Sequence, residues 1–156
     1  MRQAGGKGVK SLSLFVPGLP VGQPRPRATS FGGRARMYDP GTSNEWKACV
    51  IHAAQGNAGL FPAGTPVRCD LTFYLPRPNG HFGSGKNAGV LKPSAPTRPT
   101  GKPDRDNLEK AVLDALTAAG VWGDDSQVTD GRLRKRYAGL GYGMTGCEIR
   151  ITEDIE

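Results

Sequence analysis

Residues 102–128, KPDRDNLEKAVLDALTAAGVWGDDSQV, determine the fold prediction because they contain the clearest helical pattern of the chain. Asp106 stands where a helix N-cap is expected, Glu109 follows three residues later as in a capping box, and Gly120 ends the pattern. Apolar side chains recur along one side of the helix between these ends: Leu108, Ala111, Val112, Ala115, Leu116 and Ala119. The sequence therefore predicts an amphipathic helix over residues 107–119.

Acidic side chains flank this helix at both ends. Pro103 disfavours helical backbone in the residue before it, so the lead-in is expected to be extended, with Asp104 and Asp106 on one side. Asp124 and Asp125 follow the helix. Neighbouring carboxylates repel each other unless a cation lies between them, and Mg²⁺ is commonly bound by one or two carboxylates. The alternative is that Asp106 only caps the helix and Asp104 is a solvated loop residue.

The two acidic segments resemble those of the RusA-type endodeoxyribonucleases, which resolve Holliday junctions. That family has the pattern D-x-D-N-L-x-K, a helix, and then D-D-x-Q-V, and residues 102–128 match it. The resemblance implies that Asp104, Asp106 and Asp125 are catalytic and bind metal, and that Lys110 is catalytic without being a ligand. Asp124 is the neighbouring acid, without an assigned role. The implied cofactor is Mg²⁺, with Mn²⁺ as an alternative.

Length and charge are consistent with one DNA-binding domain. The 156 residues are enough for a single sizeable core, and the net charge is +7. Residues 1–100 contain 13 Lys and Arg against 3 Asp and Glu, whereas residues 101–156 contain 8 against 11. Basic groups hold phosphates and acidic groups hold metal ions, so this division suits a metal-dependent nuclease. The alternative is that scattered charges only keep the protein soluble.

Residues 1–10 are interpreted as a flexible basic tail and residues 11–156 as one RusA-like endonuclease domain.

Several other classes of protein are disfavoured. No apolar run approaches 18 residues and no signal peptide is visible, which predicts a cytoplasmic protein, nucleoid-associated when bound to DNA, without membrane contact. Residues 80–87, GHFGSGKN, imitate a P-loop, but Asn87 replaces the required Ser or Thr, so no nucleotide cofactor is expected. Three separated cysteines predict buried free thiols: Cys49, Cys69 and Cys147.

The remaining pattern predicts an α+β fold. Alternation of apolar side chains predicts strands at residues 11–16, 66–75, 127–137 and 146–152, with 66–75 central. A second helix is predicted at residues 43–55, with Ser43 as its cap. The expected order is β-α-β-α-β-β, a single domain with a mixed sheet and two main helices on one face.

Basic segments supply the predicted DNA contacts. Residues 22–38 form a loop or a Gly-Gly hairpin rich in arginine, and residues 77–101 form a basic Gly/Pro-rich loop without acids. The long loop is interpreted as a flap over DNA or, alternatively, as a tolerated insertion. For each of these basic segments, the alternative to contact with phosphate is a basic loop that is only solvated. The side chains assigned to DNA are Arg25, Arg27, Arg34, Arg36, Lys86, Lys102, Arg105 and Arg134.

The position of Asp125 raises a geometric question. The predicted helix carries the chain about 20 Å away from Asp106, and residues 120–125 span at most roughly 20 Å when extended. Asp125 therefore rejoins Asp104 and Asp106 only if the chain doubles straight back, or it reaches the site of a partner subunit. A homodimer is expected because two symmetric cuts need two equivalent sites. The functional alternatives are a nuclease acting on other branched DNA, and a non-catalytic DNA-binding protein.

Overall fold

The computed structural model describes residues 8–38, 41–139 and 143–155. Residues 1–7 of the predicted tail lie outside this description, and residues 8–10 are exposed. The elements follow one another in the order β1 (Ser11–Pro17), β2 (Arg27–Phe31), β3 (Arg34–Tyr38), α1 (Asn44–Ala53), β4 (Val67–Leu75), η1 (Asn79–His81), η2 (Gly85–Asn87), α2 (Arg105–Ala118), η3 (Asp125–Gln127), β5 (Val128–Asp130), β6 (Leu133–Tyr137) and β7 (Gly146–Glu153).

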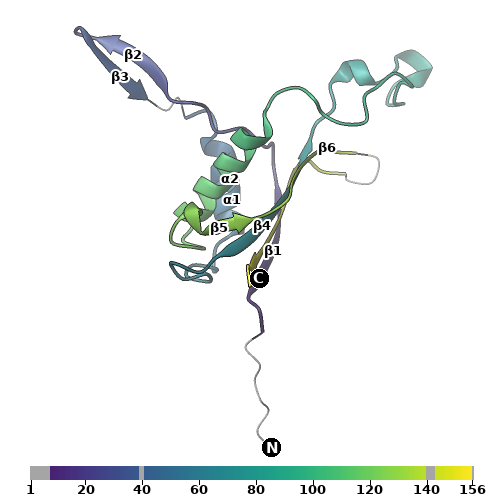
Figure 1. The fold of residues 1–156 in the computed structure, drawn as a ribbon. Coiled ribbons are helices and arrows are strands. Elements are labelled where there is room, and N and C mark those ends of the chain that lie inside the picture. The colour runs from purple at the N-terminus through teal and green to yellow at the C-terminus, as the bar shows by residue number, and fades with distance from the viewer. Residues whose placement is uncertain (1–7, 39–40, 140–142, 156) are drawn as a thin grey trace, which may run out of the picture.

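The strand β4 lies at the centre of a five-stranded mixed sheet, as predicted for residues 66–75 (Figure 1). On one side, β7 pairs antiparallel with β4, and β1 pairs antiparallel with β7. On the other side, β5 and β6 both pair with β4 in parallel. The parallel pairing follows from the connection through α2, because parallel neighbours need a long crossover. The predicted mixed sheet is confirmed.

The single strand predicted at residues 127–137 is wrong, because the chain breaks there into η3, β5 and β6. Gly131 lies at the break between the two strands. A Cβ atom at Gly131 would lie 2.0 Å from the carbonyl oxygen of Cys69 in β4. Only glycine allows this close approach, so β5 and β6 share one edge of β4 with a bend between them.

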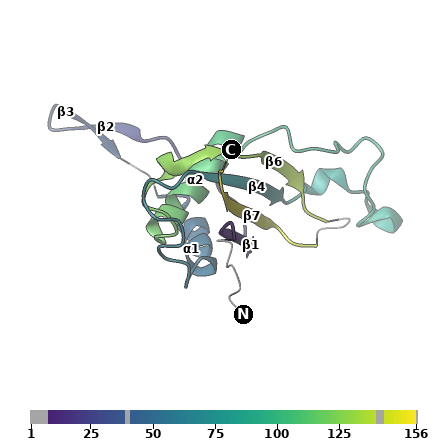
Figure 2. The ribbon, with the colours of Figure 1, turned by 60° about the horizontal axis from the view of Figure 1, so that its bottom comes forward.

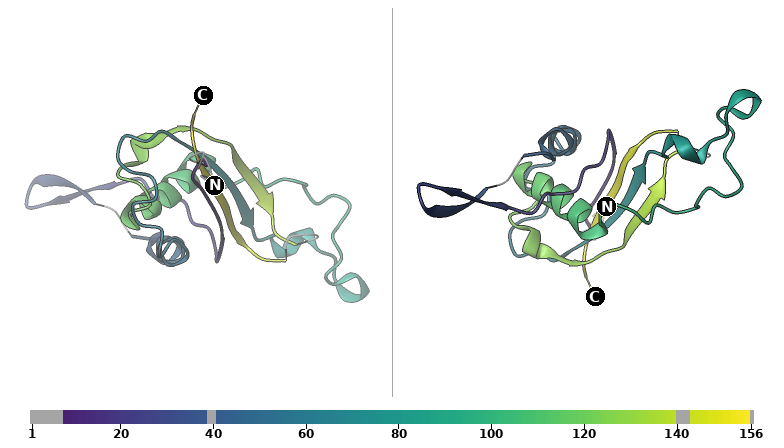
Figure 3. Two further views of the ribbon diagram at one scale, coloured as in Figure 1. Left: turned by 90° about the horizontal axis from the view of Figure 1, so that it is seen from below. Right: turned by 90° about the horizontal axis from the view of Figure 1, so that it is seen from above.

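Both α1 and α2 cover one face of the sheet, as predicted (Figures 2 and 3). The apolar stripe of α2 is buried from Leu108 to Leu116, against sheet residues such as Phe73 and Ile149. Burial of such large side chains contributes about 1.5–3 kcal/mol each. The two tryptophans, Trp46 in α1 and Trp122 after α2, also belong to this core, each only 2% exposed.

Of the two predicted N-caps, the one of α2 is wrong and the one of α1 is confirmed in its position. The helix α2 begins at Arg105, so Asp104 occupies the N-cap position and Asp106 lies in the first turn. The carboxylate of Asp104 makes no capping bond and instead lies 3.0 Å from Nζ of Lys102. Ser43 occupies the N-cap position of α1, as predicted, but its Oγ donates to Oε1 of Gln23 and makes no side-chain capping bond.

Two extensions project from the sheet and helices at opposite ends of the molecule (Figures 1 and 3). One is the β2–β3 hairpin, whose Gly32 and Gly33 have φ of 62° and 78°, as a tight two-residue turn requires. The hairpin alternative for residues 22–38 is therefore the correct one. The other extension is the long loop after β4, which contains η1 and η2.

Among the described residues, no helix is both long and apolar enough to cross a bilayer. All three cysteines are free, and Cys69 and Cys147 are buried, but Cys49 is exposed on α1, so its predicted burial is wrong. Burial raises the pKa of Cys69 to about 12, and the charges of Glu109 and Asp70 add to this shift, so its thiol stays protonated at neutral pH.

Candidate active site

A hollow of about 470 Å³ opens at the N-terminal end of α2, and we call it the acidic hollow. Asp104 and Asp106 both line it, and Glu109 lies one turn further along the helix. The other lining residues come from the end of the long loop, the helix start and β6: Thr100, Gly101, Arg105, Leu133 and Lys135. The two aspartates that the sequence paired are therefore brought together, beside two cationic side chains.

Hydrogen bonds tie the walls of the acidic hollow together. Arg105 donates from its guanidinium to the carbonyl oxygen of Leu133 at 3.3 Å, which joins α2 to β6. Lys135 donates from Nζ to the carbonyl oxygen of Gly101 at 2.7 Å, which joins β6 to the end of the long loop. The acidic hollow is thus formed where residues 100–109 meet β6, which lies more than 20 residues further along the chain.

The segment before the β2–β3 hairpin also packs against the start of α2. The backbone N–H of Gln23 donates to the carbonyl oxygen of Asn107 at 2.8 Å. A Cβ atom at Gly22 would lie 3.0 Å from Cβ of Asn107, so the absence of a side chain allows this approach. The base of the hairpin is therefore attached next to the acidic hollow.

Lys110 and Asp125 form a second group beside the acidic hollow. The Nζ atom of Lys110 lies 2.9 Å from Oδ1 of Asp114 and 3.6 Å from Oδ2 of Asp125. The chain after α2 therefore does double back, and one subunit suffices to bring Asp125 to the helix. The hydrogen bond with Asp114 raises the pKa of Lys110 against the opposing effect of partial burial. Lys110 is an ammonium group at neutral pH and has no lone pair to offer a metal ion.

The turn that carries Asp125 has its own capping box. The side chain of Asp124 accepts a hydrogen bond from the backbone N–H of Ser126 at 2.9 Å, and this bond is the main cause of the lowered pKa of Asp124. In return, Oε1 of Gln127 accepts from the N–H of Asp124 at 3.0 Å and from that of Gly123 at 2.8 Å. These bonds give Asp124 and Gln127 a structural part in placing Asp125.

The donor chemistry of the acidic hollow fits a hard cation. Asp104 and Asp106 offer carboxylate oxygens, and Mg²⁺ needs only one or two carboxylates beside water and phosphate oxygens. In the described parts of the chain, however, no three Asp, Glu, His or Cys side chains converge closely enough to hold a metal ion. Asp125 does not line the acidic hollow. The structure thus pairs Asp104 with Asp106, and Lys110 with Asp125, without joining all three aspartates.

Comparison with known proteins identifies the family. The family model described as "Endodeoxyribonuclease RusA" matches residues 17–152. The chain belongs to the RusA family. An uncharacterized protein of Bacillus subtilis (strain 168), YqaN, is 37% identical to it over 127 residues, which cover 81% of this chain and 88% of that protein.

Shorter matches link the chain to RusA proteins themselves. The crossover junction endodeoxyribonuclease RusA of Escherichia coli (strain K12) is 50% identical over 50 residues, 32% of this chain and 39% of that one. The RusA protein of Enterobacteria phage 82 matches over the same lengths with the same identity. The resemblance inferred from residues 102–128 is therefore confirmed.

The predicted DNA-binding side chains of this RusA-family chain fall into three groups. Lys102 and Arg105 lie close to the acidic residues, one paired with Asp104 and the other lining the acidic hollow. Arg25 and Arg34 are exposed near or in the hairpin, whereas the side chains of Arg27 and Arg36 lie outside what the structure describes.

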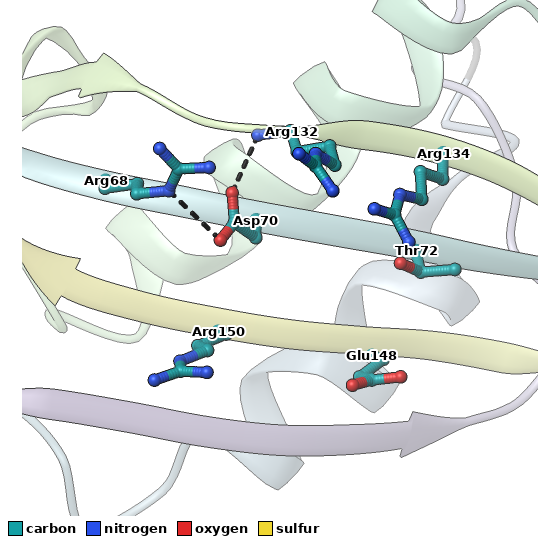
Figure 4. A pocket seen from close by; sticks show the side chains of 7 residues that line it. All are labelled: Arg68, Asp70, Thr72, Arg132, Arg134, Glu148 and Arg150. Carbon is teal, nitrogen blue, oxygen red and sulfur yellow. Dashed lines mark hydrogen bonds and ion pairs between the residues drawn. The ribbon is translucent and has the colours of Figure 1, made fainter.

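The third group lies away from the acidic hollow. Lys86 is part of η2, in the loop that projects from the sheet (Figure 1). Arg134 of β6 lies on the sheet face opposite the helices (Figure 4). The neighbouring Lys135 lines the acidic hollow instead. Contact with DNA by either side chain stays a prediction.

Sequence reasoning missed three residues of the site. The sequence indicates only a capping box for Glu109, and it assigns no role to Lys135 or Asp114. The i, i+4 spacing of Lys110 and Asp114 was the one available signal for their contact.

Proposed function

We propose that this RusA-family chain is a Mg²⁺-dependent endodeoxyribonuclease that resolves four-way DNA junctions by paired, symmetric phosphodiester hydrolysis in recombination and repair. The observation that supports it most is the acidic hollow. Asp104 and Asp106 offer oxygen ligands there, while Arg105 and Lys135 offer positive charge to a phosphate. Carboxylates and cations in one hollow suit the hydrolysis of a phosphodiester better than DNA binding alone, because binding gains nothing from negative charge near phosphate.

Each side chain has a definite part in this proposal. Asp104 and Asp106 would hold the metal ion, with Asp125 as a further ligand. A bound Mg²⁺ supplies an activated water and neutralises the phosphate. Arg105 and Lys135 bind and orient the phosphate at the wall of the acidic hollow. Lys110, held as an ammonium group by Asp114, stabilises the negative charge that develops during hydrolysis.

The proposed active form is a homodimer. Resolution of a four-way junction requires cuts in two strands related by symmetry, and a twofold dimer presents two equivalent sites. We place one complete set of aspartates in each subunit, because Lys110 contacts Asp125 of its own chain.

A cleavage assay tests the proposal. The protein and its Asp106→Asn variant are incubated with a labelled four-way junction or a matched linear duplex, with and without Mg²⁺. We expect paired symmetric nicks in the junction alone, which the variant loses while it still binds. Junction binding without cleavage in Mg²⁺ or Mn²⁺ would instead identify a DNA-binding protein. Preferred cutting of flaps or forks would identify a nuclease for other branched DNA.

A further inference from the structure

The sheet face opposite α1 and α2, which we call the open face, is rich in arginine. No described helix covers it (Figures 2 and 3). A hollow of about 280 Å³ lies on this face, between β4, β6 and β7. The side chains around it are Arg68, Asp70, Thr72, Arg132, Arg134, Glu148 and Arg150 (Figure 4).

Asp70 orders the arginine side of this hollow. One carboxylate oxygen accepts from Nε of Arg68 at 3.2 Å and the other from the backbone N–H of Arg132 at 2.8 Å (Figure 4). Arg68 also pairs with Asp130 at 2.8 Å. Partial burial favours the protonated form of Asp70, but these hydrogen bonds outweigh it and lower the pKa of Asp70. The charge of Arg68 is thus matched by two carboxylates.

The other three guanidinium groups form no ion pair of this kind, although the charge of Arg132 also contributes to the lowered pKa of Asp70. Within the described part of the chain, no ion pair involves Arg132, Arg134 or Arg150. They line the hollow from two sides (Figure 4). Arg132 directly precedes β6, Arg134 lies on β6, and Arg150 lies on β7. Planar guanidinium groups bind phosphate through paired hydrogen bonds, so three unmatched ones form an anion-binding surface.

A second hollow, of about 470 Å³, continues this surface toward the long loop. It shares Thr72, Arg134 and Glu148 with the first hollow, so the two are continuous. It adds three more arginines, Arg77, Arg98 and Arg136. Arg77 is fixed there, because it donates to the carbonyl oxygen of Pro96 and stacks over Tyr137 at 4.2 Å.

The strand β6 separates the open face from the acidic hollow. Alternation along β6 places Arg134 and Arg136 on the open face and Lys135 in the acidic hollow with Asp104 and Asp106. Among the described strands, β6 pairs only with β4, so it forms an edge of the sheet. A DNA backbone that passes Lys135 therefore meets Arg134 after crossing a single strand.

We propose that the open face is a second DNA-binding surface, which holds the phosphate backbone of a junction arm as it leaves the acidic hollow around the edge strand β6. This inference rests on the proposed function. Charge decides between DNA and a second copy of the chain as the occupant. Two copies facing each other would bring unmatched arginines together, whereas DNA phosphates neutralise them.

Binding measurements test the open face without requiring cleavage. Junction affinity is measured against salt concentration for Asp106→Asn, and for the same chain with Arg132→Ala, Arg134→Ala and Arg150→Ala added. We expect the magnitude of the slope of log affinity against log salt to fall by up to about 2.7 for each subunit that holds DNA on its open face, since each lost phosphate contact on B-DNA removes about 0.9. Arg150→Glu should weaken binding roughly tenfold or more.

Matched controls keep the result specific. Lys10→Glu makes the same change in net charge as Arg150→Glu at an exposed position before β1, and it should change junction affinity less than threefold. Thermal unfolding establishes that each variant is folded. Unchanged affinity and salt slope in the arginine variants would overturn the proposal. So would a change in oligomeric state by sedimentation, which would make the open face a contact between copies.

A cleavage arm separates this inference from the proposed function. If the wild-type chain binds junctions but does not cut them in Mg²⁺, the proposed function is wrong. A loss of affinity in Arg150→Glu but not in Lys10→Glu would still support the open face as a DNA-binding surface.

Discussion

At the scale of single residues, the side chain of Lys110 is held in place by its neighbours. Its ammonium group is held by Asp114 from the same helix and lies near Asp125 from the returning chain. A lysine side chain has many rotamers, and fixing one of them has an entropic cost that the carboxylate of Asp114 offsets. We therefore assign Asp114 a positioning role.

Replacing Asp114 by Asn should slow cleavage without weakening binding. The hydrogen bond to Lys110 loses its charge, so we expect the single-turnover rate to fall about tenfold, equivalent to about 1.4 kcal/mol in the barrier. Junction affinity in the absence of divalent metal should stay within threefold. Asp114→Glu keeps a carboxylate and should recover part of the rate. Equal losses in both variants would contradict a positioning role.

At the residue scale, the sequence predicted Asp104 and Asp106 as neighbours because extended backbone repeats every two residues. It did not predict Lys135, since alternation along β6 divides its side chains into two sets without indicating which set faces the helices. The place of Lys135 depends on how β6 packs against α2, which sequence spacing does not indicate. The sequence also did not predict the ion pair of Lys102 with Asp104, which is two residues away, because side-chain conformation decides such a local contact.

At the scale of elements, the short helix η3 connects α2 to the sheet. Gln127, only 7% exposed, accepts from two backbone N–H groups of the turn and donates from Nε2 to the carbonyl oxygens of Pro62 and Thr65 at 2.9 and 3.0 Å. This amide joins η3 to the loop before β4. The position of Asp125 therefore depends on a residue with no part in the chemistry.

Gln127→Ala should destabilise the protein by about 2–4 kcal/mol, because it leaves several polar backbone groups without partners. Chemical denaturation measures this change. The matched control is Gln55→Ala, an exposed glutamine after α1, which should change stability by less than about 0.5 kcal/mol. A loss below 1 kcal/mol for Gln127→Ala would contradict the assigned role. The variant should also cleave more slowly below its unfolding temperature.

Sequence patterns predicted long elements better than their ends and breaks. The stripe of α2 and the alternation of β4 follow from burial on one side, which periodicity records directly. The break at Gly131 depends instead on the carbonyl oxygen of Cys69, which lies in a strand 62 residues earlier. The N-cap of α2 was assigned two residues late, because Asp104 and Asp106 are chemically equal candidates and packing decides between them.

At the scale of the whole molecule, mixed dimers test whether each subunit holds a complete site. Chains with Asp106→Asn and chains with Asp125→Asn are combined, and junction cleavage is measured. We expect no recovered activity, because Asp125 contacts Lys110 within one chain. Recovery of one active site in part of the mixture would mean that Asp125 acts across the dimer. Wild-type chains mixed with either variant serve as the positive control.

The burial of both tryptophans has a practical consequence for spectroscopy. Trp46 and Trp122 belong to the helical side of the core, and neither lines the acidic hollow or the open face. Intrinsic fluorescence will therefore report the loss of the core on unfolding and will stay nearly constant when DNA is added. Cys49 is exposed, whereas Cys69 and Cys147 are buried, so a single dye can be attached to Cys49. The dye would report association separately from the tryptophan fluorescence.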